Sequence, residues 1–332
     1  MIDAYASQIQ YHDHIWPIWE ALNNRGEFTI HQSLAGRRSA DRVAAFPPPN
    51  RRTPIIVAGQ VDLAKTARKR SVLVEHGAGQ TYLTAQAGYA GGPARGRVAL
   101  FLCPNEQVAK LNRDRYPEAK SVVVGSPRVE WLARRRAAGR FVTSRPVVAF
   151  SFHFDCKLWP EAEWAFPYYR TQLVSLIPKL SEGYEILGHG HPRAWGQLRK
   201  FWAKVGVEPV EEFTEIVERA DLYVCDNSST LFEAAAIDIP VVLLNQPRYR
   251  RDIEIGLRFW EWADIGPQVD TPQGLRAGIE AGLLDGYQSR REQMTSTVYS
   301  GVVGAVHRAA ETIADFCELT NDNPNAGRRP AP

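Results

Sequence analysis

The fold is decided by the stretch ADLYVCDNSSTLFEAAAIDIPVVLLN, residues 220–245. Its two ends are apolar and rich in Val and Leu, so they predict strands that are covered on both faces. A short helix is predicted between them, and small polar side chains precede it: Asp226, Asn227, Ser228, Ser229 and Thr230. Strand, helix and strand in this order indicate one repeat of a parallel α/β sheet.

Apolar runs of strand length recur along the chain, with helical stretches between them. They occupy residues 54–59, 71–77, 98–104 and 121–127 in the first half, and 146–152, 184–190, 220–226 and 240–246 in the second half. This alternation predicts an α/β protein with parallel sheets.

The length of 332 residues is enough for two domains. We interpret the basic segment 131–146 as the interdomain connection, and one continuous sheet is the alternative. The predicted domains are an N-terminal domain over 1–140 and a C-terminal domain over 145–290. Apolar residues at helical spacing predict one amphipathic helix at about 290–318, which can pack back on the first domain. The tail 320–332 is expected to be disordered.

Composition narrows the class of protein. Hydrophobic residues make up 44% and charged residues 23% of the chain, as in globular proteins. No signal peptide is visible and no apolar run approaches roughly 20 residues, so we expect a cytoplasmic protein without stable membrane insertion. Four widely spaced cysteines without a CxxC pair fit free thiols in a reducing compartment. The net charge of +3 is too small to require a nucleic-acid partner.

The polar residues before the predicted helix have two interpretations. Ligands of parallel sheets bind at the carboxyl ends of strands, where the first N–H groups of a helix lack internal partners and attract anions. Ser228, Ser229 and Thr230 add hydroxyl groups there, which favours a nucleotide pyrophosphate. Alternatively, Thr230 and Glu233 form a T-x-x-E capping box that satisfies the helix start internally.

A histidine follows the predicted strand at 71–77. His76 precedes Gly77 and Gly79, whose freedom from a side chain allows a sharp turn and a close approach to a ligand. An imidazole at the carboxyl edge of a sheet suits a general base that takes a proton from an acceptor hydroxyl. A structural histidine is the alternative.

Other strand ends carry candidate anion-binding side chains. His191 and Arg193 follow the strand at 184–190, and they can meet a phosphate. His153 follows another strand, and Arg128 is either an anion ligand or a solvated side chain. No Asp-x-Asp motif is present, so we expect neither a metal ion nor another cofactor.

Four segments, in this order, resemble the CDP-glycerol glycerophosphotransferase family: EHGAG at 75–79, VVGSPRVEWL at 123–132, GHGHPR at 188–193 and the stretch at 220–245. The resemblance covers about residues 55 to 250. It implies the GT-B architecture, in which two Rossmann-like domains with parallel sheets face a central cleft.

The resemblance also implies a function for these residues. A nucleotide-diphosphate donor is expected in the C-terminal half, with His191, Ser228 and Ser229 on its phosphates, and His76 as the base. Some segments depart from the family: EHGAGQ lacks a Trp before His76 and Pro-Leu-Lys after it, and FSFHFD stands where a Pro-Thr-x-Arg strand is usual. These departures make transfer of a glycosyl group at least as plausible as transfer of the glycerol phosphate group that the resemblance implies. The accepting hydroxyl belongs to a glycan, a polymer, a protein or modified DNA.

Two other functions remain open from the sequence. An isomerase similar to UDP-sugar 2-epimerases would need carboxylates for acid–base work, for which Glu75, Asp155 and Asp226 are the candidates. A non-enzymatic nucleic-acid-binding protein would use clustered basic residues. These clusters lie at 68–70, 134–136 and 248–251.

Overall fold

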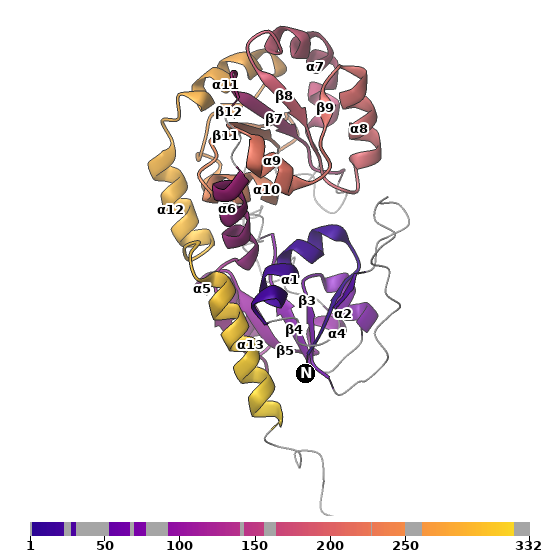
Figure 1. The fold of residues 1–332 in the computed structure, drawn as a ribbon, viewed down its shortest axis with the longest axis vertical. Helices are drawn as coiled ribbons and strands as arrows, with labels where there is room; N and C mark the ends of the chain where they lie inside the picture. Colours follow the sequence, from indigo (N-terminus) through magenta and orange to yellow (C-terminus); the bar gives the residue numbers. More distant parts are fainter. Residues whose placement is uncertain are drawn as a thin grey trace, which may run out of the picture. The chain divides into compact units, whose positions relative to one another are not determined.

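The computed structural model describes residues 2–22, 28–30, 53–66, 70–77, 92–139, 143–155, 164–226, 228–249 and 261–321. The chain forms two compact units. The first unit comprises residues 1–76, 89–128 and 303–332, and the second comprises 77–88 and 129–302. Each unit contains one parallel sheet (Figure 1).

The sheet of the first unit has the strand order β2-β1-β3-β4-β5-β6, and all neighbouring strands are parallel. Its strands are β1 (Asp3–Ala6), β2 (Phe28–Ile30), β3 (Ile55–Val57), β4 (Ser71–Val74), β5 (Val98–Cys103) and β6 (Lys120–Val123). Because β2 and β3 lie on opposite sides of β1, the direction of strand addition reverses there. Such a reversal is where ligands bind in open α/β sheets.

Helices cover both faces of this sheet. They are α1 (Ile9–Ala21), α2 (Gln60–Thr66), α4 (Gly92–Arg95), α5 (Glu106–Arg115) and α13 (Ala305–Asn321). Helices α1 and α13 pack together on one face, where Ile15, Ile18 and Ile313 are fully buried. Leu63 of α2 and Val108 of α5 belong to the core on the other face. The helix α13 is therefore part of the first unit.

The sheet of the second unit has the order β12-β11-β10-β7-β8-β9, again with all neighbours parallel. Its strands are β7 (Val147–Ser151), β8 (Glu185–Gly188), β9 (Glu208–Pro209), β10 (Leu222–Cys225), β11 (Val241–Leu244) and β12 (Gln268–Val269). Strand order reverses between β7 and β10. The stretch quoted at the outset thus supplies one of the two strands at the reversal point.

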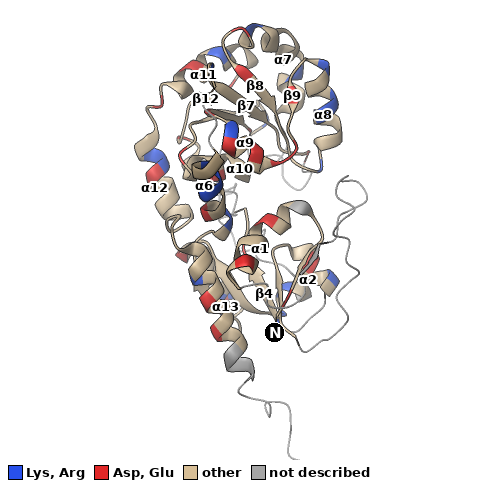
Figure 2. Cartoon of the chain, in the orientation of Figure 1, with Lys and Arg blue, Asp and Glu red and all other residues tan. Residues whose placement is uncertain are grey.

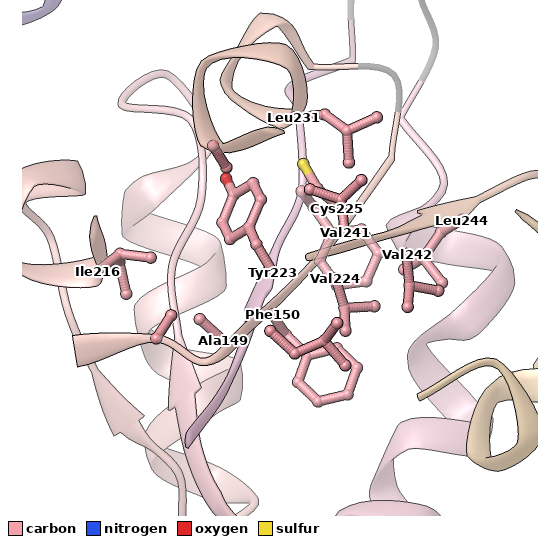
Figure 3. Packing of buried hydrophobic residues seen from close by; sticks show 14 of the residues in the cluster. Ala149, Phe150, Ile216, Tyr223, Val224, Cys225, Leu231, Val241, Val242 and Leu244 are labelled. Atoms are coloured by element: carbon pink, nitrogen blue, oxygen red, sulfur yellow. The ribbon is translucent and has the colours of Figure 1, made fainter. Parts of the chain in front are cut away.

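Strand β10 runs through the core of the second unit. Figure 3 shows Tyr223, Val224 and Cys225 packed with Phe150 of β7 and Val242 of β11, and all five are fully buried. Helices of the second unit are α6 (Pro127–Gly139), α7 (Phe166–Leu180), α8 (Trp195–Lys204), α9 (Phe213–Arg219), α10 (Ser229–Ala236), α11 (Leu275–Leu283) and α12 (Gln288–Val298), with a 3₁₀ turn η5 (Pro272–Gly274). No helix in the described part of the chain is long and apolar enough to span a membrane.

The chain passes from the first unit to the second near the start of α6, between Arg128 and Val129. The sequence placed this connection at 131–146 instead. The reason for the difference is packing, because Val129 and Leu132 of α6 are fully buried in the core of the second unit. The basic character of α6 reflects its solvent-facing side and does not mark a linker.

The single amphipathic helix predicted at about 290–318 is wrong. Helix α12 ends at Val298 and α13 begins at Ala305, and each belongs to a different unit. Between them Ser300, Gly301 and Gly304 have φ angles of 51°, 84° and 83°. Left-handed residues cannot continue a right-handed helix. The helical spacing of apolar residues continues from α12 into α13, although the glycines between them end the first helix, and this is why the sequence predicted a single helix.

Arg291 of α12 ties two turns of the second unit together. The side chain is only 2% exposed, and its guanidinium donates hydrogen bonds to Asp285 and to Asp238 Oδ1, the latter at 3.0 Å. Both aspartates have left-handed backbone conformations, with φ of 48° and 61°. Charge-assisted hydrogen bonds from one buried arginine hold these two strained positions.

Replacing Arg291 by alanine should destabilise the protein by about 2 kcal/mol, because the buried hydrogen bonds are lost while the aspartates stay partly solvated. Denaturant unfolding followed by tryptophan fluorescence measures this change. Arg276→Ala is the matched control, since the Arg276 side chain is 48% exposed and its Glu280 pair is loose at 3.9 Å. Its expected effect is below about 0.5 kcal/mol. Equal effects of the two substitutions would contradict the assignment.

Candidate functional site

His76 lies at the carboxyl edge of the first sheet, two residues after β4. Gly77 follows it with a φ of 65°, a conformation that favours glycine. The His76 ring meets two rings of α1: Tyr11 edge-on at 5.1 Å between centroids, and His14 at 5.5 Å. Tyr11 and His14 are each 8% exposed, whereas His76 is exposed to solvent. The structure thus presents the His76 imidazole on a buried aromatic support.

The pKa of His76 is lowered from its ordinary value, and desolvation by the surrounding protein is the largest cause. Glu75 and a hydrogen bond with the backbone of Ala58 oppose this by raising the pKa, and the charges of Arg95 and Arg128 lower it. The ring is therefore neutral at neutral pH. With one nitrogen bonded to the backbone, the second nitrogen can accept a proton.

A glycine makes room for the aromatic support. A Cβ at Gly59, just after β3, would lie 2.4 Å from Cε2 of Tyr11. No side chain fits there, so Gly59 is what allows the Tyr11 ring to pack beside His76. Sequence reasoning missed both residues. The available signal was the glycine that ends the apolar run 54–59.

Arg128 was expected to be an anion ligand or a solvated side chain, and solvation is excluded. The residue is 5% exposed, and its Nη1 donates to Asp13 Oδ2 of α1 at 2.9 Å. Hydrogen bonds from His12 and the charge of Arg128 lower the pKa of Asp13 against an opposing effect of burial, which is the largest single one. Burial, followed by the charges of Arg128 and His76, lowers the pKa of His14. Arg128 therefore binds Asp13 of α1, and its charge acts on His14 and His76.

Glu75 takes part in a hydrogen-bond network with Arg95 and Asn112 of the first unit. Its Oε1 accepts hydrogen bonds from Arg95 and from Asn112 Nδ2, the latter at 2.8 Å. Asn112 Oδ1 accepts in turn from Arg95 at 2.8 Å. A carboxylate held in this buried network is a structural group.

Asp226 lies at the reversal point of the second sheet, directly after β10, and it is fully buried. Its Oδ1 accepts the backbone N–H of His153 at 2.8 Å, and its Oδ2 accepts that of Ala165 at 3.0 Å. Burial raises the pKa of Asp226 to about 7, although the backbone N–H groups oppose the rise. Both oxygens are thus engaged with the chain.

The predicted capping box of Thr230 and Glu233 is wrong. Ser228 is the N-cap of α10, and its Oγ accepts hydrogen bonds from the N–H and the hydroxyl of Thr230, at 3.4 and 2.9 Å. The Thr230 hydroxyl also bonds the Tyr223 hydroxyl at 2.8 Å. The register moves by two residues because Ser228, and not Thr230, has the extended backbone of a cap. Glu233 is a buried residue of the helix interior.

This arrangement changes which groups at the helix start are candidates for binding an anion. The hydroxyls of Ser228 and Thr230 bond to each other, and Ser228 is only 5% exposed. Ser229 is partly exposed and is the first residue of α10, where N–H groups lack intrahelical acceptors. The main chain at Ser229 is therefore the better candidate donor to an anion. Asn227 and Gly79 lie outside the described residues.

Two histidines gather at the ends of β7 and β8. The rings of His153 and His191 are 5.0 Å apart, and the Phe154 ring lies 4.4 Å from His191. The Arg193 guanidinium stacks over Phe154 at 4.9 Å from the ring centroid. The sequence-predicted His153, His191 and Arg193 thus form one cluster, and the main chain of His153 links it to Asp226.

Hydrogen bonds fix the protonated nitrogen of His191. The backbone N–H of Arg193 donates to His191 Nδ1 at 3.1 Å, so a neutral ring carries its proton on Nε2. Burial, together with the charges of His153 and Arg193, lowers the pKa of His191 to about 2. The imidazole is therefore a neutral hydrogen-bond donor, and Arg193 supplies the positive charge. Arg193 is exposed and, within the described residues, forms no ion pair.

The arginine cluster 134–136 on α6 is engaged within the second unit. Arg134 pairs with Glu130 at 2.6 Å and Arg135 Nε donates to Glu218 at 2.7 Å. Arg136 donates to two carbonyl groups at the end of α9. Figure 2 shows basic residues on α6 and acidic residues on α9. Charges that are already paired are poor phosphate ligands, which weakens the nucleic-acid interpretation.

Within the part of the chain that the structure describes, no three His, Cys, Asp or Glu side chains lie close enough together to hold a metal ion.

Comparisons with known proteins identify the fold. No protein-family model and no curated protein sequence matches the chain. The wall teichoic acid polymerase TagF matches 98% of this chain and 90% of its own, with 14% identity and a TM-score of 0.65. A putative UDP-N-acetylglucosamine 2-epimerase from Listeria monocytogenes matches with 96% coverage of both chains, 12% identity and a TM-score of 0.61. The UDP-GlcNAc 2-epimerase from Neisseria meningitidis bound to UDP-GlcNAc covers 95% of this chain and 99% of its own, at 12% identity and a TM-score of 0.51.

These similarities define the class of fold. The chain has the GT-B architecture that its sequence resemblance implied, with two Rossmann-like units that each contain a parallel sheet. The expected resemblance to the CDP-glycerol glycerophosphotransferase family, with its GT-B fold, is confirmed at the level of the fold.

Proposed function

We propose that this protein is a GT-B transferase that moves a group from a nucleotide-diphosphate donor to an acceptor hydroxyl without a metal ion. The observation that carries the proposal is the cluster at the reversal point of the second sheet. His191, a neutral imidazole donor, and Arg193, whose guanidinium forms no ion pair among the described residues, follow β8. The start of α10 at Ser229 follows β10, on the other side of β7. Phosphate groups are the ligands that such a set of donors binds best.

We assign His76 and the His191–Arg193 cluster different roles in the transfer. His76, neutral and supported by Tyr11 and His14, removes the proton of the acceptor hydroxyl as it attacks the donor. The nucleotide leaves with increasing negative charge on its phosphate. The Nε2–H of His191 and the guanidinium of Arg193 stabilise this charge, which lowers the barrier.

The transferred group is a glycosyl or a glycerol phosphate group. Solved structures with the same fold include a wall teichoic acid polymerase, a TagF variant soaked with CDPG, and an epimerase bound to UDP-GlcNAc. The CDPG and UDP-GlcNAc of these structures support a nucleotide-linked donor for this chain. The acceptor is a hydroxyl of a glycan, a polymer, a protein or modified DNA.

Transfer is favoured over epimerisation by the state of two of the three candidate carboxylates, Glu75 and Asp226, whereas the third, Asp155, is exposed. Acid–base work on a sugar needs carboxylates that reach the substrate, but Glu75 is held by Arg95 and Asn112. Asp226 is buried with both oxygens bonded to backbone N–H groups. His76 is the better placed base, since its side chain is exposed.

A panel of CDP, UDP, GDP and dTDP tests the donor site by thermal shift. We expect at least one to stabilise the protein, by about 2.7 kcal/mol at a concentration of one hundred times its Kd. In Arg193→Ala the affinity should fall about tenfold, because one charge-assisted contact to phosphate is lost. Arg199→Ala, an exposed arginine of α8 in the same unit, is the control and should bind like the wild type. A wild-type protein that none of the four nucleotides stabilises at millimolar concentration would refute the proposed function.

A further inference from the structure

Asp226 joins two points of the chain that are far apart in sequence. The connection between β7 and α7 leaves β7 at Phe152 and enters α7 after Ala165, the N-cap of that helix. At its beginning His153 donates its N–H to Asp226 Oδ1 at 2.8 Å, and at its end Ala165 donates to Oδ2 at 3.0 Å. One carboxylate therefore closes the described ends of this connection on each other.

A carboxylate is a costly choice for this position. Burying a charge costs more than burying a neutral group. The fully buried Asp226 forms no ion pair with an arginine or lysine among the described residues. A carboxylate offers two acceptor oxygens, at a fixed separation, to two N–H donors. An asparagine, a serine or a backbone carbonyl offers only one oxygen. The double acceptor explains why an aspartate occurs here. The pKa, raised by burial to about 7, is consistent with a group kept for its hydrogen bonds.

The clamped main chain carries the ring cluster of the candidate donor site. The His153 Nδ1 bonds the carbonyl of Phe154 at 3.0 Å, which fixes the ring against its own backbone. His191 packs on both rings, and Arg193 stacks on Phe154. A shift of the His153 main chain therefore moves each group of the cluster.

We infer that Asp226 is a positioning residue of the donor site, whose carboxylate clamps both ends of the β7–α7 connection and so places His153, Phe154 and His191 for the donor phosphates. This inference rests on the proposed function for the identity of the ligand. It assigns Asp226 no proton transfer, in contrast to the acid–base role that an epimerase would require.

The test compares Asp226→Asn with Asp221→Asn. The asparagine at 226 keeps the shape of the side chain, but its amide nitrogen cannot accept the second N–H. Asp221 is the matched control, because it precedes the same strand β10 and accepts the N–H of Val147, at the start of β7, at 2.9 Å. The two substitutions thus alter the same kind of hydrogen bond at opposite ends of one strand pair.

Three readouts are measured on the full chain: amide hydrogen exchange, the imidazole NMR signals of His191, and the Kd for CDP, UDP, GDP and dTDP. In Asp226→Asn we expect exchange at His153 or Ala165 to accelerate at least tenfold, the His191 signals to shift, and the Kd to rise about tenfold. In Asp221→Asn the Kd should stay within twofold of the wild type and the His191 signals should not move. Loss of stability alone would affect both variants.

The outcomes separate the two proposals. A folded Asp226→Asn protein whose Kd stays within twofold of the wild type overturns the positioning role, although the proposed function survives. If the wild type binds none of the four nucleotides, the proposed function fails and the donor-site role of Asp226 fails with it. Should Asp226→Asn not fold, amide hydrogen exchange of the wild-type protein tests the clamp. Exchange of the His153 and Ala165 amides at unprotected rates overturns the clamp, and strong protection of these amides supports it.

Discussion

The His76→Ala variant should transfer its group at least a hundredfold more slowly than the wild type, with its thermal midpoint almost unchanged. A positioned general base contributes roughly 10²- to 10⁴-fold to a rate. His76 is exposed, so its removal opens no cavity in the core of the first unit. Initial rates with the donor identified by the nucleotide panel measure the effect. His307→Ala is the control, because His307 is an exposed histidine of the same unit on α13.

The pH profile gives the same prediction a second readout. The pKa of His76 is lowered from its ordinary value of about 6.5. A base acts in its neutral form, which is complete above the pKa and disappears as the pH falls through it. The acidic limb of kcat/KM should therefore lie below pH 6.5 in the wild type and be absent from the residual activity of His76→Ala. A variant with an unchanged rate and an unchanged acidic limb would show that another group is the base.

The Gly188→Ala variant should lose about 3 kcal/mol of stability. Gly188 ends β8, and a Cβ on it would lie 2.3 Å from Cγ of Trp202, which is fully buried. The Trp202 ring cannot retreat without breaking the hydrogen bond from its Nε1 to the His189 carbonyl, at 3.1 Å. The added methyl group therefore forces apart the core beneath the strand end that carries His191.

Denaturant unfolding measures this loss, and Gly183→Ala provides the matched control. Gly183 lies in the turn at the other end of β8, and a Cβ there meets nothing within 4 Å. Alanine at such a position is expected to be neutral or stabilising by up to about 1 kcal/mol, through the unfolded chain. Similar stabilities for the two variants would contradict the packing described at Gly188.

The strands that the sequence predicted are those whose composition reflects burial on both faces. All eight apolar runs overlap a strand, because Val, Ile and Leu fill strands that helices cover. The exception in burial is β6, which lies at the sheet edge and is exposed or only partly buried. The sequence did not predict the strand β1, because its four residues, DAYA, include no β-branched residue. Strands β9 and β12 have two residues each and lie at sheet edges. Segments this short carry no periodic signal.

The candidate site was predictable where it depends on strand ends and not where it depends on long-range pairing. His76, His153 and His191 were found because polar residues after buried strands lie at the carboxyl edge of a sheet. The bonds from Asp226 to the backbone of His153 and Ala165 join positions 73 and 61 residues apart. Only the folded arrangement of β7 and β10 brings them together. No local spacing encodes such a contact.

Amide hydrogen exchange of the wild-type protein, with and without the most stabilising of the four nucleoside diphosphates, tests the central claim most directly. The account predicts slower exchange at residues 188–193 and 228–231, where the ends of β8 and β10 meet the candidate phosphate site. Slower exchange confined to segments of the first unit, with these two segments unchanged by saturating nucleotide, would contradict it.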